Sequence, residues 1–147
     1  MNLAEDLIIV GSQLNKFLGV AKPLSLAIPR RRKHVSIIFD KKKIIAVGTN
    51  TMKGHPLAKS LGYRFEEQHS ELNAYLKCKQ RTGLSLLNVR YNEAGVLRMA
   101  RPCPLCLPWC KAIFDEIYYT CPLGQVRLLA QSTSVSPLKS NLSLAWA

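Results

Sequence analysis

The chain has 147 residues, of which 48% are hydrophobic and 20% are charged. This size and composition favour one soluble globular domain with a real core, and no run approaches the roughly 18 apolar residues of a membrane-spanning helix. The net charge of +12 and the pI near 9.8 exceed what an enzyme of small neutral metabolites needs. They favour a polyanionic or phosphorylated partner, with a basic surface that has no role in binding as the alternative.

The first 50 residues predict a helix and then a hairpin. Apolar residues recur at spacings of three and four from Leu3 to Ala21, which predicts a helix of about 18 residues that packs through one face. The β-branched runs 35–39 and 44–47 are separated by a charged tetrapeptide and predict two antiparallel strands. His34 opens the first of these strands and is interpreted as a structural residue.

The rest of the chain alternates between helices and strands. The predicted elements are a loop over about 51–67, helices over 69–81 and 102–114, and strands over 86–91, 116–121 and 126–130. The last two strands should be antiparallel, because the residues between them are too few for a parallel crossover. This order predicts an α/β fold, with a mixed five-stranded sheet covered by helices in a single domain over residues 1–130. We expect the Ser-rich residues 131–147 to form a loosely held tail.

Two short motifs carry the chemistry of this sequence. They are His69-Ser70-Glu71 and, 34 residues after the histidine, a Cys-x-x-Cys motif in which prolines precede and follow Cys103. The imidazole of His69 and the thiolates of Cys103 and Cys106 provide three ligands for Zn²⁺, which leaves the fourth tetrahedral position for water. Glu71 follows the histidine closely, so its carboxylate can handle the proton of that water.

The other cysteines leave an alternative open. A closed structural site would need a fourth protein ligand, for which Cys110, His55 and Cys121 are the candidates. We interpret Cys78, Cys110 and Cys121 as small buried hydrophobic residues with free thiols. Together with Glu5, an acid where a signal peptide would be basic, they predict a reducing, intracellular and cytoplasmic location.

The paired motifs resemble those of the cytidine and deoxycytidylate zinc deaminases, the CMP/dCMP-type family. The run from His69 to Ala74 is similar to the family's helix segment, which usually has alanine where Ser70 stands, and Gly48-Thr49-Asn50 is similar to its Gly-x-Asn strand end. The segment around Cys103 and Cys106 also resembles small deaminase-domain proteins of phages and large viruses. The resemblance covers about residues 34–129.

The resemblance implies a cytidine-deaminase-like fold and a hydrolase acting on the C–N bond of a cyclic amidine, which converts cytosine to uracil with Zn²⁺ as its cofactor. Glu71 would move protons between the attacking water, ring N3 and the leaving amine. The backbone N–H of Ser70 would bind the carbonyl oxygen of the base, the backbone carbonyl of Arg101 would accept from the exocyclic amine, and Asn50 would bind the sugar. Pro108 departs from the pattern and is expected to distort the predicted third helix.

Several basic residues lie in segments that lead to these motifs, which suits phosphate on the substrate. The predicted phosphate contacts are Arg30, Arg31, Arg32, Lys53, Arg64 and Arg98. Cytosine in single-stranded nucleic acid, such as DNA, is the first expected substrate, and a free deoxycytidylate or cytidine-type nucleotide is the alternative. A catalytically silent, zinc-stabilised module that binds nucleic acid is a further hypothesis, and adenosine in tRNA is a weaker one. We expect no membrane partner, and the oligomeric state stays open.

Overall fold

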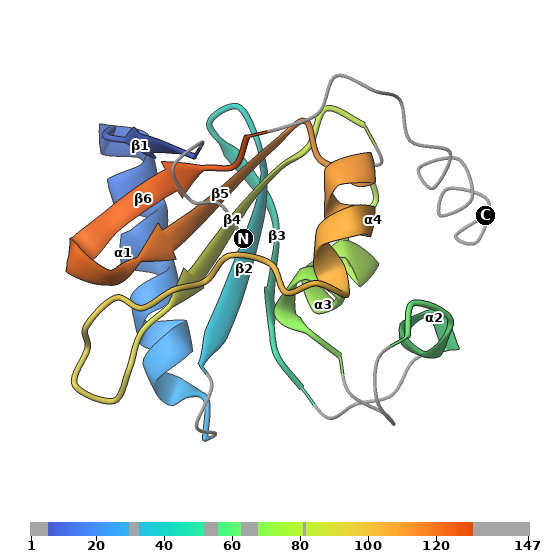
Figure 1. Ribbon diagram of the computed structural model, residues 1–147, viewed down its shortest axis with the longest axis horizontal. Helices are drawn as coiled ribbons and strands as arrows, with labels where there is room; N and C mark the ends of the chain where they lie inside the picture. Colours follow the sequence, from blue (N-terminus) through green and yellow to red (C-terminus); the bar gives the residue numbers. More distant parts are fainter. Residues whose placement is uncertain (1–5, 30–32, 52–55, 63–67, 81, 131–147) are drawn as a thin grey trace.

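The computed structural model of the protein describes residues 6–29, 33–51, 56–62, 68–80 and 82–130. They form a mixed α/β structure around a six-stranded sheet with the strand order β1-β6-β5-β4-β2-β3 (Figure 1). The strands are β1 (Leu7–Ile9), β2 (His34–Asp40), β3 (Lys43–Thr49), β4 (Ser85–Arg90), β5 (Glu116–Cys121) and β6 (Gln125–Leu128). The helices are α1 (Ser12–Ala27), α2 (Pro56–Ser60), α3 (Ser70–Leu76) and α4 (Cys106–Ile113), and a 3-10 turn, η2, spans Pro122–Gly124.

The pairing of the strands follows the lengths of their connections. The short turn between β2 and β3 and the turn between β5 and β6 both join antiparallel strands, which confirms the two predicted antiparallel pairs. β4 and β5 are parallel, and α4 lies in the crossover between them, as a parallel pair requires. The edge strands of the described sheet are β1 and β3.

The N-terminal prediction is wrong in two respects. The sheet has a sixth strand, because Leu7–Ile9 pair with β6 as β1, and the first helix begins only at Ser12. The buried positions Leu14, Phe17 and Ala21 do lie on α1 with the predicted spacing, whereas Leu7 is 64% exposed. The aliphatic residues before the helix therefore continue the apolar pattern by coincidence and meet the requirements of an edge strand instead.

The two faces of the sheet are covered by different helices, with α1 on one face and α3 and α4 on the other (Figure 1). Because side chains alternate along a strand, Val35 and Ile37 of β2 pack in the same cluster as α1, whereas Ile38 packs in the cluster of α3 and α4. Trp109 is 1% exposed and contacts Tyr75 in that second cluster. The core therefore holds α3 and α4 against one face of the sheet.

The second predicted helix has its start where expected, but the third does not. His69 is the N-cap of α3, which ends at Leu76 rather than near residue 81. The third predicted helix begins at Cys106 instead of residue 102, which places Pro108 in the first turn of α4. Backbone N–H groups in a first turn have no partner within the helix, so Pro108 removes no bond there and the predicted distortion is wrong.

The predicted tail over residues 131–147 lies outside the described residues, so its prediction stays a prediction. Among the helices described, none has both the length and the apolar character needed to cross a bilayer.

Candidate metal centre

The start of α3 is fixed against the end of β3 by a close backbone approach. A Cβ atom on Gly48 would lie 2.3 Å from the backbone nitrogen of Ala74, so only glycine allows α3 to pack at this distance. The side chain of Asn73 strengthens the contact, because its Oδ1 accepts the backbone N–H of Thr49 at 3.1 Å. The residues at the N-terminus of α3, His69 among them, are therefore placed accurately relative to the sheet.

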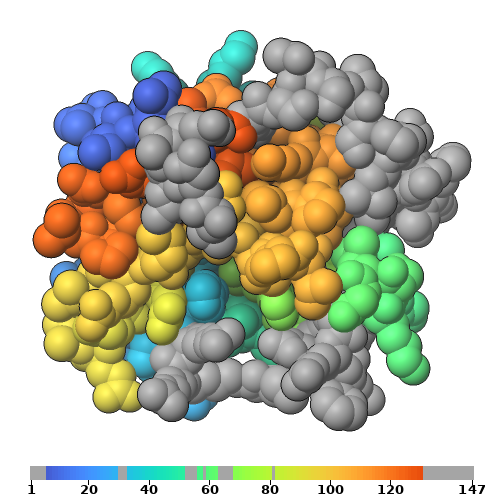
Figure 2. All heavy atoms as spheres, in the orientation of Figure 1, coloured from blue at the N-terminus to red at the C-terminus, as the bar shows by residue number. Residues whose placement is uncertain are grey.

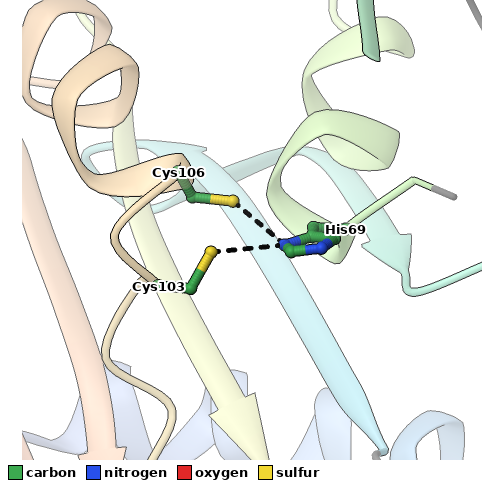
Figure 3. A group of neighbouring side chains, drawn as sticks. All are labelled: His69, Cys103 and Cys106. Atoms are coloured by element: carbon green, nitrogen blue, oxygen red, sulfur yellow. Dashed lines mark hydrogen bonds between the residues drawn. The ribbon is translucent and has the colours of Figure 1, made fainter. Parts of the chain in front are cut away.

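The structure brings His69, Cys103 and Cys106 together into a cluster that could hold a metal ion (Figure 3). Nδ1 of His69 lies 3.5 Å from Sγ of Cys103 and 3.3 Å from Sγ of Cys106. A tetrahedral zinc with Zn–S bonds of ~2.3 Å and Zn–N bonds of ~2.0–2.1 Å would separate these atoms by about 3.6 Å. The donor types and their spacing therefore fit zinc.

The two thiols differ in their protonation. The hydrogen bond from Cys106, and then the interaction with His69, lower the pKa of Cys103 to about 4 although burial opposes this shift. Burial, and then the interaction with Cys103, raise the pKa of Cys106 above its ordinary range. At neutral pH the pair without metal therefore shares one proton, which a metal bound by both sulfurs would displace.

The closed Cys₃His site finds no support among the described residues. The metal-ligating cluster there contains His69, Cys103 and Cys106, and Cys110 lies outside it although Cys110 is fully buried. Sγ of Cys121 instead donates to the backbone carbonyl of Gln125. Cys78, Cys110 and Cys121 are all buried with free thiols, as predicted, and His55 lies outside the described residues.

A cavity of about 630 Å³ opens beside the cluster. In Figure 2 the molecule is hollowed between the yellow segment and the orange helix α4, where blue atoms of the sheet lie recessed. A cavity of this size suits a ligand as large as a nucleotide. The lining residues are His34, Asn50, His69, Ser70, Glu71, Asn88, Arg90, Ala100, Arg101 and Cys103. Two of the three metal-ligating residues and the carboxylate of Glu71 thus face one space.

A buried chain of hydrogen bonds holds the Glu71 carboxylate. The hydroxyl of Ser70 donates to Oε1 of Glu71 at 3.0 Å, and Oγ of Ser36 lies 2.8 Å from Oγ of Ser70. Oγ of Ser36 also contacts the side-chain amide of Asn88 at 2.6 Å, and its single hydroxyl hydrogen is available to Ser70 when that amide is the donor. Glu71 itself is 5% exposed, so the hydroxyl of Ser70 supplies a donor to a carboxylate that has little contact with water. The serine that replaces the usual alanine of the resembled family is therefore part of the support of Glu71.

A second buried carboxylate supports the loop that carries Cys103. Oδ2 of Asp6 accepts from Nε of Arg101 at 3.2 Å and from the hydroxyl of Tyr119, and Oδ1 accepts from the backbone N–H of Ala130 at 2.9 Å. Burial alone would raise the pKa of Asp6, but these donors, Ala130 first, outweigh it and lower the pKa. The interaction ties the start of the described chain to the loop before Cys103.

The structure brings most of the predicted site residues together. Glu71, Ser70, Asn50 and Arg101 all line the cavity beside the metal-ligating cluster. Arg98 is exposed and does not line it. The other predicted phosphate contacts, Arg30, Arg31, Arg32, Lys53 and Arg64, lie outside the described residues.

Besides Ala100, sequence reasoning missed three polar or charged residues of the cavity. They are His34, which was interpreted as structural, and Asn88 and Arg90 at the end of β4. A signal for Asn88 was available, because a polar residue interrupts the apolar run of a strand that is buried on both faces. Such an interruption marks the point where the core of the sheet gives way to a cavity.

Comparisons with known proteins give no assignment. No protein-family model matches the chain, and no curated protein and no solved structure matches it.

Proposed function

We propose that this protein is a zinc-dependent hydrolytic deaminase that converts cytosine to uracil on a domain of the cytidine-deaminase type. One observation carries the proposal: two residues of a His-Cys-Cys cluster with zinc-like spacing line the same cavity as a buried carboxylate. A structural zinc site needs neither a cavity nor an acid beside it, whereas hydrolysis needs both. The resemblance of the motifs supports the same conclusion.

The chain's own residues account for the proton transfers. His69, Cys103 and Cys106 would hold Zn²⁺, which when bound supplies a Lewis acid that activates water. Glu71 accepts a proton from the attacking water and delivers it to N3 of the ring. The same carboxylate then takes the second proton of that water from the hydroxyl group now on C4 and donates it to the leaving amino group, so that the C4–N bond breaks and ammonia departs. One carboxylate can perform both steps because it alternates between base and acid.

Other residues of the cavity would hold the base and the sugar. Ser70 would bind the carbonyl oxygen of the base through its backbone N–H, and the backbone carbonyl of Arg101 would accept from the exocyclic amine. Asn50 accepts the backbone N–H of His34 with its Oδ1 at 3.0 Å, so its amide group is held at the cavity wall. Its Nδ2 would donate to a sugar hydroxyl.

The cationic character of the protein extends the proposal to phosphorylated substrates. The net charge of +12 favours single-stranded nucleic acid as the substrate, with a free deoxycytidylate-type nucleotide as the alternative. The same charge favours a second candidate function, a zinc-stabilised module that binds nucleic acid without catalysis. The buried Glu71, which accepts from the hydroxyl of Ser70, argues for catalysis, because a binding module has no use for it.

The test compares wild type with Glu71→Gln, which keeps the shape of the side chain and removes its acid–base chemistry. Zinc-loaded protein is given a cytosine-containing DNA oligonucleotide, its RNA counterpart, dCMP and cytidine, and uracil formation is measured. We expect product with wild type and a loss of at least ~100-fold in kcat with Glu71→Gln. The absence of product from all four substrates, with one zinc bound per chain, would reject the deaminase and favour the silent module.

A further inference from the structure

We infer that His34 and Arg90 bind the phosphate group attached to the sugar of the substrate. The inference rests on the proposed function, since it names the part of the substrate that this corner of the cavity recognises. The shared chemistry is a phosphate ester, either the monoester of a free nucleotide or a diester of a nucleic-acid strand.

The register of the sheet places the two side chains next to each other. His34 is the first residue of β2, Arg90 is the last residue of β4, and the two are direct partners across the antiparallel pair. Side chains of directly opposite residues on antiparallel strands stand about 5 Å apart at Cβ and on the same face. An imidazole and a guanidinium therefore project together at one end of the sheet, where both line the cavity.

The same face of this strand pair changes from apolar to polar toward the cavity. Ile38 and Leu86 are partners within the core, and Ser36 and Asn88 come next as buried polar partners. The pair of His34 and Arg90 follows, half-buried and carrying the positive charge of Arg90. The side chains on this face thus change from aliphatic groups to a hydroxyl and an amide, and then to a positively charged group. This order suits a ligand that is polar at one end and anionic at the other.

The spacing along β2 matches the parts of a nucleotide. Ser36 marks the level of the catalytic carboxylate, because it contacts Ser70, which donates to Glu71. His34 lies two residues before Ser36 in β2, which corresponds to about 7 Å at the usual rise per residue of a strand. This distance is comparable to that between the pyrimidine ring and the phosphate of one nucleotide. Asn50, the proposed sugar ligand, exchanges hydrogen bonds with the backbone of His34 and so lies at the level of His34.

Arg101 is the other cation of the cavity, and its geometry assigns it elsewhere. Its guanidinium is ion-paired with Asp6, whose side chain is 1% exposed. A buried ion pair of this kind holds the loop before Cys103 and resists exchange for a ligand phosphate. Arginine binds phosphate with two parallel N–H donors, and Arg90, the last residue of β4, brings such a guanidinium to the cavity wall.

Equilibrium binding tests the inference without requiring turnover. In the Glu71→Gln background with zinc bound, affinities are measured for dCMP, deoxycytidine and a trinucleotide with a central cytidine. We expect Arg90→Gln to lower the ratio of affinity for a phosphate-bearing ligand to that for deoxycytidine by about 10- to 100-fold. Lys42→Gln removes the same charge from the exposed hairpin turn and is expected to leave that ratio unchanged. His34→Gln should produce a smaller fall in the same ratio.

The outcomes separate this inference from the proposed function. A fall confined to dCMP identifies a monoester, and a fall confined to the trinucleotide identifies a diester; both support the phosphate site. Equal losses for deoxycytidine and the phosphate-bearing ligands, or equal effects of Arg90→Gln and Lys42→Gln, would overturn it. Deamination by wild type together with an unchanged ratio in Arg90→Gln would reject the phosphate site alone, whereas a changed ratio without any deamination would reject the enzyme alone.

Discussion

Zinc should stabilise the folded protein, because its proposed ligands come from two separate elements. His69 caps α3, and Cys103 and Cys106 lie before and at the start of α4. The ion would therefore join two helices that also contact each other in the core through Tyr75 and Trp109. An unfolded chain does not hold the three donors at 3.3–3.5 Å, so the ion binds mainly to the native state.

The size of the effect follows from mass action. Free zinc at 100 times its Kd stabilises the native state by about 2.7 kcal/mol. For a domain of this length each kcal/mol raises Tm by about 2–4 °C, so the expected increase is about 5–10 °C. Thermal unfolding followed by circular dichroism, with zinc and then with excess chelator, measures it directly.

Two cysteine variants make the measurement specific. Cys103→Ser removes one ligand and should abolish most of the zinc-dependent shift. Cys121→Ser removes a buried thiol outside the cluster and should keep the shift, although its Tm without metal is lower. An equal shift in Cys103→Ser and wild type, or no shift in wild type, would show that the cluster does not bind zinc in the way its geometry indicates.

Four further outcomes are expected. Zinc binding should release about one proton, from Cys106, so that the affinity for zinc falls up to tenfold for each unit by which pH is lowered near neutrality. Calorimetry in buffers of different ionisation enthalpy counts the released protons. A count of zero would contradict the raised pKa of Cys106. Gly48→Ala should cost ~3 kcal/mol or more in urea unfolding, since the new methyl group meets the backbone of α3, and an unaffected midpoint would deny that close approach. Asp6→Asn should cost about 2 kcal/mol at pH 7. Because the pKa of Asp6 is lowered on folding, its stabilisation is complete above its ordinary pKa of 3.8 and disappears as pH falls below it, so wild type and variant should converge in acid; a constant difference would refute the assignment. Ser70→Ala should lower kcat about tenfold with zinc affinity retained, because Glu71 loses its hydroxyl donor, and an unchanged kcat would make the serine a packing residue only.

The chemistry of the site was more predictable than its surroundings. The motifs of His69 and Cys103 predicted a cluster because imidazole and thiolate have few other reasons to recur at such spacing, and the structure does gather them. The hairpin and the last antiparallel pair were also predictable, since connection length limits topology. Each of these predictions rested on one dominant physical cause, which was either the ligand chemistry of a short motif or the length of a connection.

At other positions the prediction from sequence failed, because the structure there depends on contacts between residues far apart in the chain. Leu7–Ile9 form a strand only because β6 offers a free edge, which no local pattern reveals. Pro108 looked disruptive until the structure placed the start of α4 at Cys106, two residues before it. His34 and Arg90 lie 56 positions apart in the sequence and become neighbours through the β2–β4 register, which joins elements that are not consecutive in the chain.

The arrangement of β2 and β4 explains why this end of the sheet serves a ligand rather than the core. Ser36 and Asn88 are at most 2% exposed, and a buried polar group without a partner costs about 1–3 kcal/mol. Apolar side chains at both positions would pack with Ile38 and avoid that cost, so stability alone does not account for them. What the polar pair does provide is a series of polar contacts through Ser70, whose hydroxyl donates to the carboxylate of Glu71. The polar residues are therefore best explained by the position of one acid beside the metal-ligating cluster.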